Sequence, residues 1–151
     1  ALGAITIRAE AAWLSDVPYT RSTDFLQQTS ESAQWVLGVE AFPGDRNFRV
    51  TAQVAGQHLL DADDPVDFEN ITSLSGELES PLGSGAGWRA SLRYSFRLDE
   101  DGSYWNPELT YLGLEPSELY LGLHYFDGRN GTAESFYRNN DTIVIGIRTQ
   151  F

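Results

Sequence analysis

The sequence contains no cysteine and no lysine, and it has no long apolar run. The absence of cysteine excludes disulfide bonds and thiolate metal sites. No stretch of about 18 apolar residues occurs, which excludes a transmembrane helix. The basic residues are ten arginines against 22 acidic residues, and the resulting net charge of −12 makes nucleic acid an unsuitable partner. At 151 residues the chain is short enough for a single domain spanning residues 1–151.

What the sequence does have is a repeated alternation of apolar and polar residues. In 88–97 every second residue, from Trp88 to Phe96, is apolar, and the residues between them are serine or arginine. This period of two predicts a β-strand with one apolar and one polar face. Pro107 removes a backbone donor, so a bulge or an unpaired position is expected there. We predict eight strands, at about 5–14, 33–42, 47–58, 72–80, 88–97, 103–112, 118–125 and 141–151.

The expected strands have about the nine to eleven residues that a tilted strand needs to cross a bilayer. Their connectors alternate in length. Three of the four odd-numbered connectors, the polar stretches at 15–32, 61–70 and 127–140, are long, and the fourth, 98–102, is short. The three even-numbered connectors, 43–46, 81–87 and 114–117, are all short. Membrane β-barrels of the bacterial outer membrane show this asymmetry, with short turns on the periplasmic side.

The large aromatic residues of the apolar parity fall near strand ends. Aromatic rings favour the headgroup level of a membrane, so this placement predicts two aromatic girdles. A soluble barrel or sandwich with an aromatic core is the alternative, but such a core requires bulky groups in the middle of its strands. The expected outer girdle is Trp13, Trp35, Phe96, Trp105 and Tyr125, and the inner girdle is Phe48, Trp88, Tyr111 and Phe151.

The polar parity carries charges that no apolar core would hold. In a narrow barrel lumen these charges must be paired. Counting across the turns places Glu40 opposite Arg49 and Glu79 near Arg89. Eight strands leave a lumen that side chains can fill, so a sealed barrel is expected; a solvated exterior face is the alternative. The predicted lumen network is Arg8, Glu10, Glu40, Arg49, Glu77, Glu79, Arg89, Arg93, Glu108, Glu118, His124 and Arg148.

The alternation, the connector lengths, the girdles and the terminal strand ending in Phe151 together resemble bacterial outer-membrane β-barrels over essentially the whole chain. The resemblance implies an all-β fold: an eight-stranded antiparallel up-and-down transmembrane β-barrel with both termini in the periplasm. It implies the bacterial outer membrane as the location. Its implied partners are outer-membrane lipids, lipopolysaccharide and the barrel-assembly machinery, which would read the strand ending in Phe151.

Three functions stay open for such a barrel. The first is a structural or surface-interaction protein with a plugged lumen and without catalysis, cofactor or metal. The second is the C-terminal part of a larger porin-like channel, since 124–151 also resembles the end of certain large proteobacterial barrels. The third is a lipid A-modifying enzyme using His58 or His124, although no spacing defines a triad. The acidic 61–67 segment lacks the EF-hand pattern and is expected to be solvated loop charge.

Overall fold

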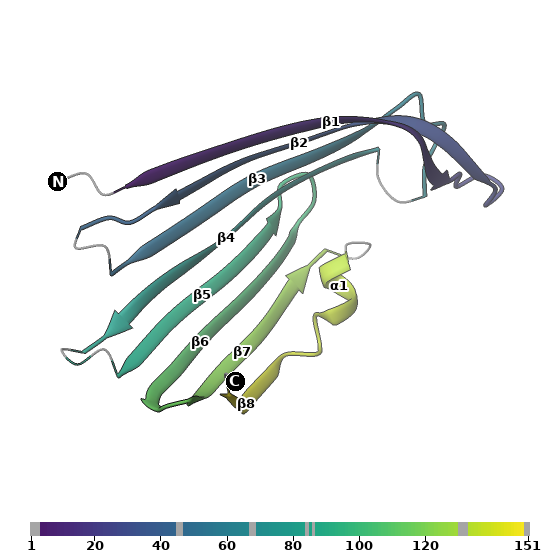
Figure 1. Ribbon diagram of the computed structural model, residues 1–151. Coiled ribbons are helices and arrows are strands. Elements are labelled where there is room, and N and C mark those ends of the chain that lie inside the picture. Colours follow the sequence, from purple (N-terminus) through teal and green to yellow (C-terminus); the bar gives the residue numbers. More distant parts are fainter. Residues whose placement is uncertain are drawn as a thin grey trace.

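The computed structural model describes residues 4–44, 47–66, 69–83, 85, 87–129 and 133–149. These residues form one sheet of eight antiparallel strands, each paired with the next along the chain (Figure 1). The predicted all-β, up-and-down topology is therefore confirmed. The five-residue helix among them is too short to cross a membrane. The elements are β1 (Ile5–Thr20), β2 (Gln27–Ala41), β3 (Arg49–Leu60), β4 (Asn70–Leu82), β5 (Trp88–Arg97), β6 (Gly102–Leu114), β7 (Ser117–Gly128), α1 (Ala133–Tyr137) and β8 (Thr142–Thr149).

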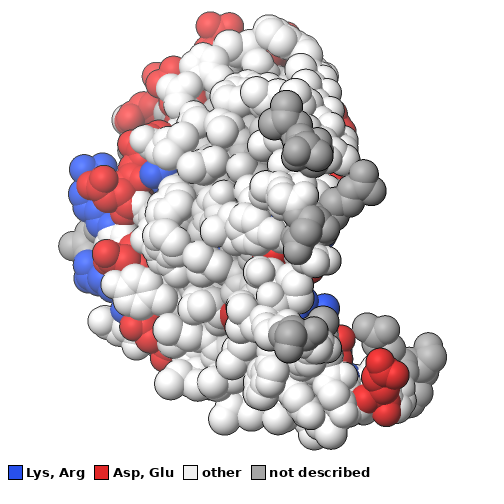
Figure 2. Space-filling model, turned by 90° about the vertical axis from the view of Figure 1, so that its left-hand side faces the viewer, with Lys and Arg blue, Asp and Glu red and all other residues white. Residues whose placement is uncertain are grey.

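The sheet is curved but open. β1 and β8 lie at its two opposite edges and do not pair with each other (Figure 1). The space-filling outline is accordingly C-shaped, with a hollow on one side (Figure 2). The closed barrel expected from the sequence is therefore not observed: the structure has an open sheet with two free strand edges.

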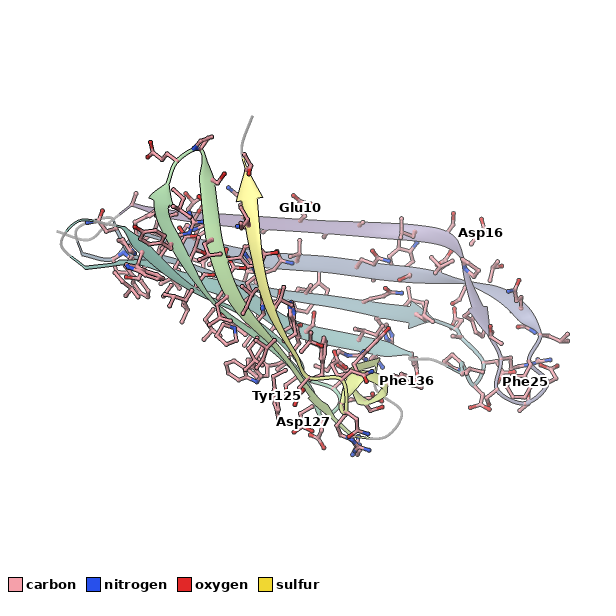
Figure 3. All side chains as sticks on the ribbon, turned by 90° about the horizontal axis from the view of Figure 1, so that it is seen from below. Glu10, Asp16, Phe25, Tyr125, Asp127 and Phe136 are labelled. Carbon is pink, nitrogen blue, oxygen red and sulfur yellow. The ribbon has the colours of Figure 1, made fainter. Side chains whose placement is uncertain are left out.

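The first two strands are longer than expected, because the predicted polar connector at 15–32 is mostly a hairpin. β1 continues to Thr20 and β2 begins at Gln27, with a register shift between Leu14 and Val17. Asp16, inside this shift, has a φ of 58°, in the left-handed region. The alternation of apolar residues stops there, which hid the continuation from sequence reasoning. The hairpin bends at this point, with Asp16 at the bend and Phe25 at its tip (Figure 3).

Two predicted cross-strand pairs are wrong by two residues. Glu40 lies opposite Thr51 instead of Arg49, because the β2–β3 connection spans 42–48 and is wider than a tight turn. Arg89 lies opposite Pro81, and Glu79 lies opposite Ser91. Since a shift of two residues preserves the faces of a strand, the assignment of polar and apolar faces is unaffected.

The two faces of the sheet differ in chemistry and in exposure. On the apolar face the branched side chains at the sheet edges are uncovered: Ile7 is 71% exposed, and Ile145 is 73% exposed. Buried hydrophobic residues are few among the described ranges, being Tyr19 and Leu59. Within the described residues, therefore, no layer covers the apolar face of the sheet.

Candidate functional site

Eight charged side chains from β3 to β8 form one connected series of ion pairs on the polar face. We call this series the ion-pair ladder. The alternation of the strands places all eight on one face, and the register brings neighbours into range: Glu77 lies opposite Arg93, and Glu118 opposite Arg148. In order, the ladder runs Glu79, Arg49, Glu77, Arg93, Glu108, Arg148, Glu118 and Arg89, with N–O distances of 3.4, 2.9, 3.1, 4.0, 3.7, 3.6 and 3.1 Å.

Two of these pairs skip a strand, which shows that the polar face is concave. Arg89 on β5 reaches Glu118 on β7, across β6. Arg148 on β8 reaches Glu108 on β6, across β7. Side chains converge in this way only on the inner side of a curved sheet. The apolar residues of the other parity therefore lie on the convex side.

Glu108 is the most enclosed carboxylate of the ladder, with a side chain only 8% exposed. Its Oε2 lies 4.0 Å from Arg93 and 3.7 Å from Arg148, and its Oε1 accepts a hydrogen bond from the Thr110 hydroxyl at 3.1 Å. Thr110 is itself almost fully buried. The carboxylate is thus the junction between the β5 and β8 arms of the ladder.

Asn106, which sequence reasoning missed, ties the ladder to the backbone. Its Oδ1 accepts a hydrogen bond from Arg93 at 3.1 Å, and its Nδ2 donates to the Leu123 carbonyl at 2.9 Å. The neighbouring Pro107 has no N–H, and the β6–β7 pairing is interrupted at Asn106 and Pro107, as the predicted unpaired position requires. The signal was present in the sequence as a polar amide directly before a strand proline.

A backbone hydrogen bond just beyond the ends of β6 and β7 shows which residues of the two strands bond each other. The Arg129 N–H donates to the Asp101 carbonyl at 2.7 Å. Because bonding alternates along an antiparallel pair, the backbone N–H and C=O groups of the odd-numbered β7 residues point toward β6. By the same alternation, residue 107 directs its backbone nitrogen toward β7, at Leu123. The Asn106 amide therefore supplies the donor that Pro107 lacks.

The remaining predicted network residues lie apart from the ladder. Arg8 and Glu40 form their own pair at 3.7 Å. Glu10 has no ion pair with a described residue. Arg8, Glu10 and Glu40 line, with Arg49, a cavity of about 500 Å³ on the β1–β3 part of the polar face.

Some residues of the predicted aromatic girdles pack against one another. Phe96 and Trp105 pack edge to face at 4.9 Å, and Trp88 and Tyr111 lie 4.8 Å apart. Trp13 is 62% exposed on the edge strand. The girdle residues Trp35 and Tyr125 are also exposed, Phe48 precedes β3, and Phe151 lies outside the described residues.

The two histidines lie on different strands and contact neutral side chains. His124 Nδ1 is 2.8 Å from the Tyr104 hydroxyl, and His58 Nδ1 contacts the Asn70 side-chain oxygen. Neither of these contacts involves a serine or an acidic residue. The structure therefore brings together no triad around either histidine within the described residues.

Acidic residues outside the strands are held by arginines and backbone donors. The Arg21 guanidinium hydrogen-bonds Asp24 and holds the pKa of that carboxyl below its usual value. Burial works to raise the pKa of Asp99, but hydrogen bonds from Arg97 and the Thr72 N–H outweigh it and lower the pKa. The described residues contain no group of three or more metal-ligating side chains; Asp67 of the acidic segment lies outside them.

No protein-family model, curated protein or solved structure matches the chain. The features that bear on function are therefore the exposed apolar face and the ion-paired polar face of the sheet.

Proposed function

We propose that the chain forms the wall of a bacterial outer-membrane β-barrel, with lipid against its apolar face and a sealed polar interior. The observation that carries the proposal is the contrast between the two faces. The convex face exposes isoleucine, leucine and tryptophan side chains, most of them on β1, β2, β7 and β8, whereas the concave face holds the ion-pair ladder. Soluble monomers rarely leave so large an apolar surface uncovered, and a lipid bilayer would cover it.

The proposed role is that of a structural or surface-interaction membrane protein without catalysis. In the described strands the polar face has six arginines and six glutamates, so their formal charges cancel. An eight-stranded barrel has an interior just wide enough for side chains to fill, and the ladder would fill it. The proposed partners are outer-membrane lipids and lipopolysaccharide, and the barrel-assembly machinery at the terminal strand.

Fluorophore attachment at single cysteines tests the lipid contact, because the chain has no cysteine of its own. An environment-sensitive dye at Ile145→Cys, on the apolar face, is expected to emit at shorter wavelength in lipid vesicles and to be quenched by brominated acyl chains. The same dye at Gln53→Cys, on the polar face, is the matched control and is expected to escape lipid quenching. Quenching of both positions by aqueous iodide, with no effect of brominated lipid, would contradict the proposal.

A second candidate is supported by the open sheet: the eight strands as part of a wider, porin-like wall. In that arrangement the free edges of β1 and β8 pair with further strands, and the polar face lines water. The two candidates differ in conductance. For the sealed barrel we expect no steady current in a planar bilayer; sustained nanosiemens openings would favour the wider channel instead.

A further inference from the structure

The free edges of β1 and β8 present matching rows of backbone groups. Phe42 N–H donates to the Ala4 carbonyl, so even-numbered residues in the first part of β1 bond β2, and odd-numbered residues point to the free edge. On the other side, even-numbered residues of β7 bond β8, which leaves Ile143, Ile145 and Ile147 facing the free edge. On both edges the unpaired backbone groups belong to residues whose side chains are on the apolar face.

We infer that the partner of the β1 edge is the β8 edge of the same chain, in the register that places Arg148 opposite Glu10. The inference rests on the proposed membrane location, because an unpaired backbone group in hydrocarbon costs several kcal/mol whereas one in water does not. The up-and-down order makes β1 and β8 antiparallel, so they can pair directly. A shift of one residue would place the polar side chains of β8 on the apolar face of β1, so the possible β1–β8 registers differ by steps of two residues.

A tilted barrel closes with a displacement along the strands. Across the open sheet, the strand pairings carry the level of Thr6 through Glu40, Thr51, Glu77 and Arg93 to Asn106. The β6–β7 register, with Trp105 opposite Tyr125, continues this level to His124, which lies opposite Thr142. In the inferred register Thr142 instead faces Asp16. The closure therefore displaces β8 by about ten residues along β1, the stagger of a tilted barrel.

The outer aromatic girdle supports a displacement of this size. Trp35 lies opposite Ala11, two residues below the level of Trp13. Continuing across the sheet, Phe96 is two residues below Trp35, and Trp105 two below Phe96. The girdle thus descends by about one residue per strand, or roughly eight around eight strands if it is level in the membrane, so the even displacements near eight are the ones to compare.

Charge decides between the even displacements. A displacement of about eight residues places Arg148 opposite Arg8, and like charges directly opposite destabilise a strand pair. A displacement of about twelve places it opposite Ala12. Only the intermediate register gives Arg148 an acidic partner on β1, Glu10. It also places Ile147 beside Ala11, so a large side chain meets a small one on the lipid face.

The consequence is a ladder that continues into β1. Arg148 already contacts Glu108 and Glu118 at 3.7 and 3.6 Å. Glu10, on the middle part of β1 (Figure 3), would become its third carboxylate. The arginine of the last strand then joins the first strand to the rest of the interior.

Double-cysteine variants read the register directly. Ile147→Cys is combined in turn with Ala9→Cys, Ala11→Cys and Trp13→Cys, which correspond to the three displacements. After refolding in lipid vesicles and mild oxidation, Ala11→Cys/Ile147→Cys is expected to form an intramolecular disulfide at least about tenfold faster than the other two, because only that pair lies within disulfide reach.

Each other result overturns the inference. Faster bridging through residue 9 or 13 indicates a different register, and disulfide-linked dimers indicate edges that pair between copies. Absence of any bridge indicates that the two edges do not meet. These failures differ from a failure of the membrane proposal, which is read separately from lipid quenching at Ile145→Cys in the vesicles.

Discussion

Replacing Glu108 with glutamine is expected to lower the free energy of unfolding by about 1–3 kcal/mol, less than for a fully buried ion pair because the Arg93 and Arg148 side chains are 48% and 45% exposed. The carboxylate lies between Arg93 and Arg148 and is almost fully enclosed. A glutamine of the same shape still accepts the Thr110 hydroxyl bond but carries no charge. Two guanidinium groups then lose part of their compensation at the same point of the polar face.

The matched control is Glu79→Gln at the end of the ladder. Glu79 contacts only Arg49, at 3.4 Å, its side chain is 30% exposed, and Arg49 keeps its shorter pair with Glu77. We expect this variant to lose about 1 kcal/mol or less. Urea unfolding in lipid vesicles, followed by tryptophan emission, measures both. Equal losses in the two variants would show that Glu108 has no special position in the ladder.

The strands were predictable because their signal is local. In β5 every second residue is apolar, and the sequence alone gave its bounds at Trp88 and Arg97, as observed. In β1 the alternation predicted a strand end at Leu14, although the strand continues to Thr20. The left-handed backbone conformation of Asp16 breaks the alternation at that point. Period-two patterns detect regular strands and miss strands that bend through a bulge.

The partners of the charged residues were less predictable than their face. The alternation of apolar and polar residues predicted that Arg49 and Glu77 lie on the polar face. Their ion pair depends in addition on the β3–β4 register. Registers depend on turn lengths, and the predicted registers of β2–β3 and β4–β5 differ by two residues from the observed ones. Pairs that skip a strand, such as Arg148 with Glu108, depend in addition on curvature. Curvature comes from the whole sheet, and no local pattern encodes it.

Replacing Asn106 with alanine is expected to cost about 1–3 kcal/mol, because the almost fully buried Asn106 amide no longer donates to the Leu123 carbonyl. Because Asn106 substitutes for the N–H missing at Pro107, its contribution depends on that proline. In a Pro107→Ala background the backbone N–H is restored toward Leu123. There, the same Asn106→Ala change is expected to cost less, with a coupling of about 1 kcal/mol between the two sites.

Asn106→Asp is the matched control for the second contact of this side chain. Aspartate still accepts the hydrogen bond from Arg93 but has no donor for Leu123. Its response to Pro107→Ala should therefore follow that of Asn106→Ala, and the coupling can be assigned to the Leu123 carbonyl. Urea titration of the four-variant cycle measures it, and strictly additive costs would contradict the substitution of a side-chain donor for a backbone donor. A coupling of the expected size would explain how the sheet tolerates a proline in the interior of β6, where a ladder donor is needed on the β7 side.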